Sequence, residues 1–178
     1  MIALIKRLFR IGHHSVLEHI SLTFAIAGIS RVCSHQLVRH RLASYSQQSQ
    51  RYVKQLPEFV IPNSLKGSQD FKEELKRIHN LYLKMAKSLK KEDARYIIPN
   101  AQTTNIIMTM NLRELIHASS LRLCNRAQWE IRQLFQKIKA EVKHYEPVLA
   151  RFLKPRCFHL GFCPEIEPCG KYDWVVKQ

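Results

Sequence analysis

The segment RHRLASYSQQSQRYV, residues 39–53, combines anion-binding side chains with hydrogen-bonding ones. Arg39, Arg41 and Arg51 lie in it, together with His40 and several serine and glutamine residues. Arginine without lysine favours planar, two-point recognition of phosphate or carboxylate groups. The segment contains no glycine, so it is not a P-loop or a dinucleotide-binding fingerprint. It therefore predicts an anion site built from side chains, with a polar surface loop as the alternative.

Nucleophilic catalysis and metal binding are two further readings of the same region. Ser49 and its neighbouring serines could in principle be served by His40 as a base, but no Gly-x-Ser-x-Gly elbow is present. Serine in an anion-binding segment more often donates a hydrogen bond than attacks. Five histidines fall within residues 13–40, yet none of the spacings typical of metal ligands occurs. We therefore expect hydrogen-bond donors here and no metal.

Three cysteines near the C-terminus form a separate candidate site. Cys157, Cys163 and Cys169 are each separated by five residues, a looser spacing than the CxxC pairs that hold zinc. A zinc site with His159 as the fourth ligand remains an alternative to ordinary thiols. The chain has 5 cysteines in all, an odd count without a regular framework, which favours the reducing cytoplasm.

The composition predicts an anionic partner. The chain of 178 residues has 29 Lys and Arg against 14 Asp and Glu, which gives a formal net charge of +15. Nucleic acid, nucleotides, a phosphorylated cofactor or a membrane surface would all suit this charge. The basic residues are spread along the chain and no nucleic-acid-binding signature appears, although Tyr45, Tyr52 and Phe59 could stack on bases. No apolar run is long enough to span a membrane.

Helical signals come first along the chain. Residues 2–10 read as a helix closed by Gly12, and Ser15 with Glu18 three residues later has the pattern of a capping box that starts a new helix. The apolar, β-branched run at 20–30 suits either a buried strand or a buried helix. A helix over 31–38 would place Gln36 and Arg39 on one face.

The second half of the chain predicts further helices around one strand. Residues 68–91 have amphipathic helical spacing, and the β-branched run after Pro99 predicts a strand. A long helical pattern covers 111–145, and residues 155–178 form an irregular tail that carries cysteines. The predicted class is α+β: a mixed or antiparallel sheet flanked by helices, in a single domain over 1–178 that includes one long helix in its C-terminal half.

The chain also resembles a known family. Arg39-His40-Arg41, followed after seven residues by Ser49, resembles the signature of flavin-dependent thymidylate synthases. Further blocks resemble that family in the same order, over roughly residues 12 to 135: GHHSVLEHISLTF, SHQLVRHR, EDARYIIPNA and NLRELIHASSLRLCNRAQWEIR. Several separate blocks in order are far more specific than any single pattern.

The resemblance implies an enzyme that makes dTMP from dUMP. Methylenetetrahydrofolate would supply the carbon, reduced FAD the hydride, and NADPH would reduce the flavin again. The family fold is α+β, and members are homotetramers whose active sites lie at subunit interfaces. Four anionic ligands would explain the net charge without nucleic acid. Two alternatives remain: a basic single-strand nucleic-acid-binding domain, and an inactive flavin- and nucleotide-binding remnant, because only eleven residues precede Gly12 where the family usually has a longer segment.

The resemblance also implies residue roles. Arg122 matches the arginine held to ionise uracil N3, and a fixed guanidinium there would stabilise charge that develops in the pyrimidine ring. Substrate contacts are implied for Gln36, Arg39, Gln47, Ser49, Arg51, Arg95 and Arg122, with Ser49 and Arg51 supplied by a neighbouring subunit. Flavin contacts are implied for His13, Ser15, Arg39, His40, Arg41, Gln47, Asn111, Arg113 and His117. Gln47 stands where the family often has an acidic residue. Asn111 also suits the N-cap of the helix that follows it.

Overall fold

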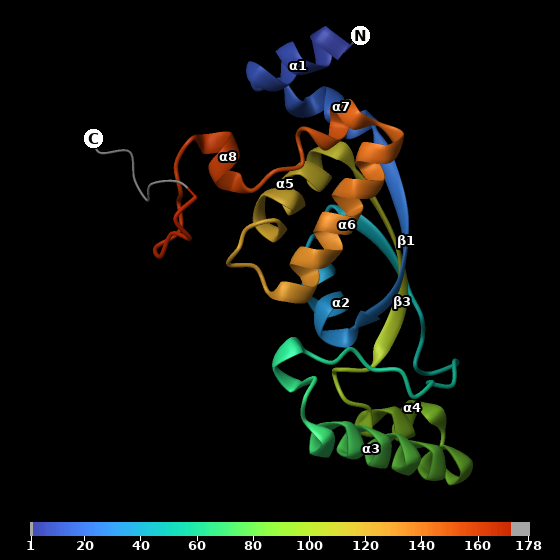
Figure 1. Cartoon of the computed structure of the whole chain (residues 1–178). Helices are drawn as coiled ribbons and strands as arrows, with labels where there is room; N and C mark the ends of the chain where they lie inside the picture. The colour runs from blue at the N-terminus through green and yellow to red at the C-terminus, as the bar shows by residue number, and fades with distance from the viewer. Residues whose placement is uncertain (1, 172–178) are drawn as a thin grey trace. The chain divides into compact units, whose positions relative to one another are not determined.

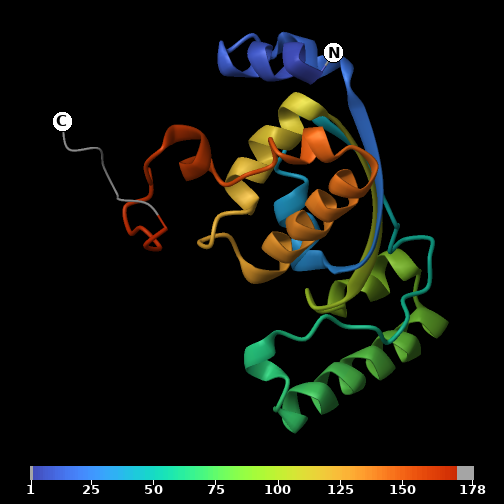
Figure 2. The same ribbon diagram turned by 45° about the horizontal axis from the view of Figure 1, so that its top comes forward.

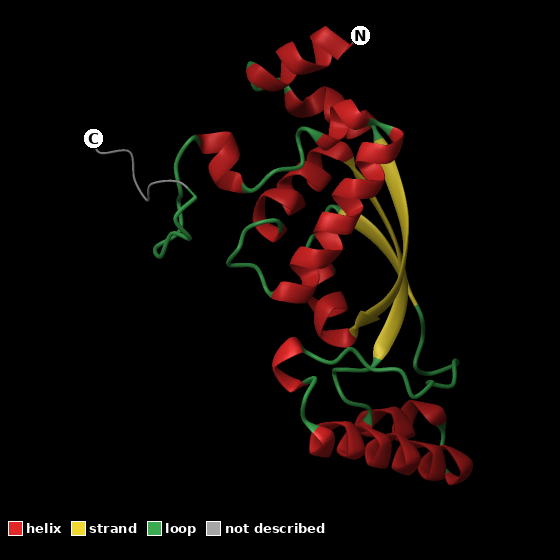
Figure 3. Ribbon diagram, viewed as in Figure 1, coloured by secondary structure: helices red, strands yellow, loops and turns green. Residues whose placement is uncertain are grey.

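The chain forms an α+β structure, described for residues 2–171 by a computed structural model. Its three strands are β1 (Ser21–Ser30), β2 (Ala43–Gln47) and β3 (Thr103–Asn111), in the order β1-β3-β2 in an antiparallel sheet (Figure 3). This confirms the predicted fold class and shows that the run at 20–30 is a strand. The single-domain prediction over 1–178 and the tail prediction include Met1 and residues 172–178, which lie outside the described part.

The described residues fall into two compact units, which we call unit 1 and unit 2. Unit 1 draws its described residues from 2–24, 40–44 and 109–171, and unit 2 consists of Ala25–Arg39 and Tyr45–Met108. The chain passes from one unit to the other within each strand. The segment 39–53 is therefore divided: His40 and Arg41 belong to unit 1, whereas Arg39 and the residues from Tyr45 onward belong to unit 2.

Unit 1 is built mainly from helices. It contains α1 (Ile2–Arg10), the 3-10 turn η1 (His14–His19), α5 (Leu112–Arg122), α6 (Trp129–Tyr145), α7 (Pro147–Ala150) and α8 (Arg156–Leu160). Helices α5 and α6 lie side by side, and α5 also packs on η1 (Figures 1 and 2). Their contact buries Leu115, Ala118, Ile131 and Phe135 completely. This apolar packing makes α5 a rigid support for the polar residues that it carries.

Unit 2 holds α2 (Arg31–Leu37), η2 (Asn63–Leu65), α3 (Gln69–Ser88), α4 (Lys91–Ala94) and η3 (Arg95–Ile97). Helix α3 packs against α4 and η3. Ser68 caps α3 by accepting a hydrogen bond from the backbone N–H of Phe71. Leu75 and Tyr82 are buried on the apolar face of this helix. The expected helices over 31–38 and 68–91 are confirmed within a few residues, as is the strand after Pro99.

Three local predictions are wrong. Ser15 does not cap a helix, because the chain enters η1 already at His14, after Gly12 turns it with a φ of 81°, and the Ser15 side chain is exposed. The helical pattern over 111–145 is two helices, not one: the Gln128 side chain accepts hydrogen bonds from Glu130 and Ile131 and so starts α6 anew. The tail is not irregular throughout, because α8 forms within it.

Candidate active site

Helix α5 and its N-cap carry half of the predicted site residues of unit 1. Asn111 caps it, with its side-chain oxygen 2.9 Å from the backbone nitrogen of Glu114, which confirms the N-cap prediction. His117 is exposed in the middle of the helix, and Arg122 lies in its last turn. The cap uses only the Asn111 oxygen, so its amide N–H groups can still donate to a ligand.

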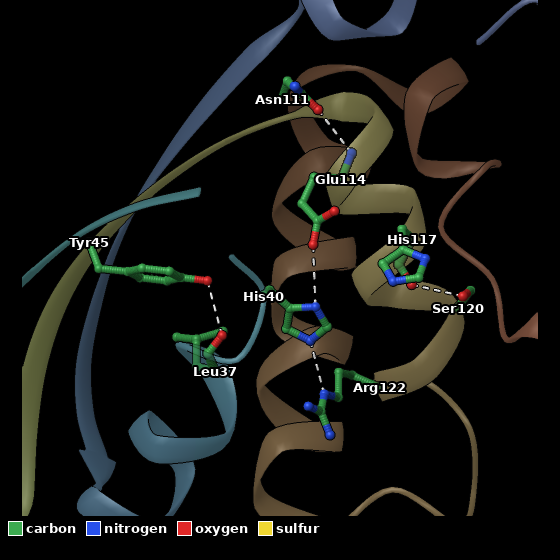
Figure 4. A network of polar contacts seen from close by, with 8 residues as sticks. All are labelled: Leu37, His40, Tyr45, Asn111, Glu114, His117, Ser120 and Arg122. Atoms are coloured by element: carbon green, nitrogen blue, oxygen red, sulfur yellow. Dashed lines mark hydrogen bonds and ion pairs between the residues drawn. The ribbon is translucent and has the colours of Figure 1, made fainter. Parts of the chain in front are cut away.

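A buried polar chain joins this helix to His40 (Figure 4). The Arg122 Nε–H donates to His40 Nε2 at 3.0 Å, and His40 Nδ1 lies 3.3 Å from Glu114 Oε1. His40 is only 5% exposed and Glu114 only 6%. The imidazole ring also lies edge-on to His117 and packs against Phe135 of α6. His40 therefore bridges Glu114 and Arg122 inside unit 1, a contact that the sequence did not suggest.

Burial shifts the pKa values of His40 and Glu114. The pKa of His40 is lowered from 6.5 to about 4, first by burial and then by the charges of Arg122 and His117. Burial raises the pKa of Glu114, while His117 acts in the opposite direction. A second proton would have to sit on Nε2, where it would face the positive charge of Arg122. Because its pKa is about 4, His40 is neutral near pH 7.

The other unit 1 residues assigned to flavin lie on exposed surface. His13 and Ser15 flank the start of η1, and Arg41 follows His40. Arg113, in the first turn of α5, forms an ion pair with Glu18 of η1. The backbone N–H of Leu112 donates to Ile20 O, which holds the start of α5 beside the end of η1. Hydroxyl, imidazole and guanidinium donors of this kind suit the pyrophosphate and ring edges of a flavin nucleotide, so the donor set fits that cofactor.

In unit 2, a short turn brings the expected phosphate-binding residues together. The Ser49 hydroxyl oxygen accepts a hydrogen bond from the backbone N–H of Arg51 at 3.1 Å. The Arg51 guanidinium lies 2.6 Å from a carboxylate oxygen of Glu92 in α4, and Arg95 Nε donates to the backbone oxygen of Glu92 at 3.1 Å. Glu92 therefore anchors both arginines, and the sequence did not single it out. Ser49 keeps its hydroxyl proton for a ligand.

A third arginine, Arg31, lies close enough to Arg95 for their charges to interact. Burial lowers the pKa of Arg31, and the charge of Arg95 lowers it further. A half-buried guanidinium next to another cation is stabilised by an anion, which fits a phosphate-binding role for this part of unit 2. Sequence analysis missed Arg31 because it precedes the RHR motif and reads there as an ordinary first residue of α2.

The remaining predicted residues of unit 2 are more scattered. Arg39 is exposed and Gln36 is partly buried on α2. Gln47 donates from Nε2 to Ser34 Oγ at 3.0 Å and to Thr104 Oγ1 at 3.2 Å, so its amide is tied to the protein. The Tyr45 hydroxyl donates to the backbone oxygen of Leu37 at 2.9 Å (Figure 4). This bond fastens β2 to the end of α2.

The other candidate chemistries have little structural support. Within residues 2–171, no group of three or more His, Cys, Asp or Glu side chains is arranged to hold a metal ion. All 5 cysteines are free thiols; Cys157 and Cys163 are buried, and burial raises the pKa of Cys157. No helix in the described residues is both long and apolar enough to cross a membrane.

Together, these features define an α+β protein whose guanidinium, imidazole and hydroxyl groups suit phosphorylated ligands and charge that develops on them. Residues 1–148 match the model of the family described as "Thymidylate synthase complementing protein". The chain belongs to this family, which confirms the resemblance found in the sequence.

Several relatives bear the name flavin-dependent thymidylate synthase. The one from Thermococcus onnurineus is 49% identical over 177 residues, covering 92% of this chain and 72% of the relative. The one from Pyrococcus horikoshii is 50% identical, with 92% and 73% covered. The one from Geobacter sulfurreducens is 48% identical over 185 residues, with 98% and 79% covered. The similarity to these relatives therefore extends over nearly the whole chain.

Proposed function

We propose that this chain is a flavin-dependent thymidylate synthase, which converts dUMP to dTMP with methylenetetrahydrofolate as the one-carbon donor. Bound reduced FAD would supply the hydride, and NADPH would then reduce the oxidised flavin again. The family membership and the names of the relatives support the reaction. The observation that carries the proposal to this chain's own residues is the Arg122 guanidinium, held at the end of α5 by a buried histidine.

Arg122 would act on the pyrimidine ring. Negative charge develops in that ring when its C6 position receives a hydride, and a guanidinium near N3 or O2 stabilises the charge as it forms. Arginine is suited to this task because it keeps its charge at every working pH. Arg122 also needs no reorganisation at the moment of reaction, because its Nε–H is already bonded to His40.

The dUMP phosphate would be bound by unit 2. We assign it to the Ser49 hydroxyl and to the guanidinium groups of Arg51 and Arg95, which the turn at 49–51 and the contacts with Glu92 hold in place. Arginine forks match two phosphate oxygens at once. Gln36, Arg39 and Gln47 would add polar contacts to the nucleotide.

The flavin would be bound largely by exposed donors. The proposed residues are His13, Ser15, Arg39, Arg41, Gln47, Asn111, Arg113 and His117. His40 completes the set implied by the family resemblance, although its two ring nitrogens face Glu114 and Arg122 in this structure. We further propose a homotetramer with active sites at subunit interfaces, and a cytoplasmic location, which the five free thiols support.

Spectroscopy and product analysis would test this function. The purified chain is mixed with FAD, freed of excess, and its visible spectrum is recorded before and after dUMP. We expect a retained flavin spectrum that dUMP perturbs, and dTMP formation when methylenetetrahydrofolate and NADPH are added. Arg122→Ala should lower turnover by about 10²–10³-fold. The exposed surface variant Arg77→Ala should behave as wild type.

Three outcomes would contradict the proposal in whole or in part. A folded protein that retains no flavin would favour the inactive remnant. Binding of single-stranded oligonucleotides that weakens steeply with salt and ignores FAD would favour a nucleic-acid-binding domain. Near-wild-type dTMP formation by Arg122→Ala would remove the role assigned to that residue.

A further inference from the structure

We propose that Glu114 is a positioning residue, which acts through His40 to fix the orientation of the Arg122 guanidinium. The proposal rests on the function proposed above for Arg122. Glu114 lies in the first turn of α5 and Arg122 in the last, so the two side chains of one helix are joined by a histidine from a distant segment. The contact between His40 and Arg122 joins residues 82 positions apart in the sequence.

The chemistry of the donors fixes the tautomer of His40. Arginine has only donors, so the His40 Nε2 atom that receives the Arg122 Nε–H must carry a lone pair and no proton. A neutral imidazole then carries its proton on Nδ1. That atom is the one that faces the Glu114 carboxylate, which can only accept. Glu114 therefore selects the tautomer that leaves Nε2 able to accept from Arg122.

The same bond fixes the plane of the guanidinium. The Nε–H bond lies in the plane of the guanidinium group, so holding it on His40 restricts rotation of the whole fork. The two terminal nitrogens are then presented in one direction. Arg122 is only partly buried, and a long side chain near the surface would otherwise lose much more conformational freedom when it meets a ligand.

A purely structural role would not require a carboxylate at this position. Glu114 is 6% exposed, and burying a charge costs free energy that an apolar residue of similar size would not cost. The groups that face His40 in unit 1 include Glu114, His117 and Arg122 from α5, and the uncharged ring of Phe135 from α6. Glu114 is the carboxylate among them, and its Oε1 lies 3.3 Å from Nδ1, where it can accept the Nδ1 proton.

A graded series of variants tests the proposal. In Glu114→Gln, the amide oxygen can still accept the Nδ1 proton, whereas Glu114→Met has a similar size and no acceptor. We expect kcat for dTMP formation to fall in the order wild type, Gln, Met, with the Met variant reduced on the order of 10²-fold because Arg122 is misplaced. The dissociation constant of dUMP should stay within about threefold, since the phosphate contacts of unit 2 are intact. Glu141→Gln, the same change at an exposed position of α6, is the control.

Nitrogen NMR of the histidine rings gives a second readout that does not depend on activity. The His40 signals are assigned by their loss in His40→Gln. In the wild type at pH 7 we expect a protonated Nδ1 and a bare Nε2, and in Glu114→Met a loss of that pattern.

Two results would overturn the proposal. One is His40 with its proton on Nε2 in the wild type. The other is a Glu114→Met enzyme whose kcat is within twofold of wild type. If the chain forms no dTMP at all, the kinetic arm fails together with the proposed function, but the NMR arm still decides whether Glu114 sets the tautomer of His40.

Discussion

His40 shows how strongly burial decides the role of a single side chain. In the sequence it stands between two arginines and resembles a ligand-binding residue. In the structure it is 5% exposed, and its ring nitrogens face Glu114 and Arg122. For the neighbouring Arg39 and Arg41, residue type and spacing alone were enough to predict anion binding. The partners of His40 could not be predicted, because they depend on how α5 packs beside it.

The pH dependence of stability should report His40 directly. Its pKa is about 4 in the folded chain and 6.5 in the unfolded one, so the unfolded state binds more protons in this range. The stabilisation is present above pH 6.5 and is lost as the pH falls toward 4. Between pH 7 and pH 5, His40 alone should remove about 2 kcal/mol of the free energy of unfolding. Chemical denaturation at the two pH values measures this loss.

The His40→Gln variant supplies the comparison. Its amide can accept from Arg122 and donate to Glu114 but does not titrate, so it should lose less stability over the same interval. Burial also lowers the pKa values of His79 and His159, which act with the same sign in both proteins. The raised pKa of Glu114 acts with the opposite sign. Equal losses in wild type and variant would show that His40 is not a neutral buried group.

Gln47 offers a second test at this scale. The family often has an acid at this position, but here the Gln47 amide donates to Ser34 Oγ, whose own proton is already donated to Arg31 O at 3.0 Å. A carboxylate can only accept, so Gln47→Glu would either lose a bond or break the one to Arg31. We expect a loss of about 1 kcal/mol in the free energy of unfolding.

The neighbouring Gln48 is the matched control for this change. Its side-chain oxygen accepts from Asn105 Nδ2 at 2.7 Å, and a carboxylate would accept equally well. Gln48→Glu should therefore leave the stability nearly unchanged in the same denaturation experiment. Similar losses in both variants would point to added charge in general rather than to the missing amide donor.

At the scale of elements, apolar spacing predicted the positions of helices better than their ends. Helix α3 matched its amphipathic pattern closely. The break between α5 and α6 was missed because Leu115, Leu121 and Trp129 continue a helical spacing across it, and spacing does not register the Gln128 side chain that starts the second helix. Similarly, Ser15 and Glu18 have the letters of a capping box, but the backbone there is already in a 3-10 turn. Caps are decided by backbone geometry, which apolar periodicity does not contain.

The N-cap of α5 is predicted to serve two purposes. Asn111→Ala removes the acceptor for the Glu114 N–H and should cost about 1 kcal/mol of stability. It should also weaken flavin retention, because the proposed ligand contact of the Asn111 amide is lost. Ser68→Ala removes the corresponding cap from α3 and should cost a similar amount without affecting the flavin.

The comparison between the two cap variants is decisive. Thermal denaturation measures the cap energy in each, and the visible spectrum after removal of excess FAD measures retention. If Asn111→Ala keeps as much flavin as Ser68→Ala, Asn111 is only a cap. If both variants lose flavin equally, general destabilisation explains the loss.

At the scale of the whole molecule, the proposed ligand-binding residues are shared between the two compact units. Arg122 belongs to unit 1, while Ser49 and Arg51 belong to unit 2. The net charge of +15 predicted an anionic partner without identifying it, because nucleic acid and small phosphorylated ligands attract the same surface. Only the residue motifs separated these classes. Assembly was likewise implied by resemblance and not by any feature of composition.

Mixing two variants tests whether neighbouring subunits share an active site, as we propose. If Ser49 and Arg51 act on dUMP bound beside Arg122 of a neighbouring subunit, homotetramers of Arg51→Ala and of Arg122→Ala each lack one half of every site. Exchange of subunits would create some sites with both halves intact. Random reassembly of equal amounts restores about a quarter of the sites, so about a quarter of wild-type dTMP formation is expected.

A second mixture removes the ambiguity. Ser49→Ala and Arg51→Ala affect the same half of the site. Every site in a mixture of these two variants therefore lacks either Ser49 or Arg51, whichever subunits combine. This mixture should show less recovery of dTMP formation than the first pair. Light scattering should give about four times the chain mass of 21.0 kDa for each variant and each mixture. Recovery in neither mixture, despite exchange of subunits shown by labelled chains, would place Arg51 and Arg122 in the active site of one and the same chain.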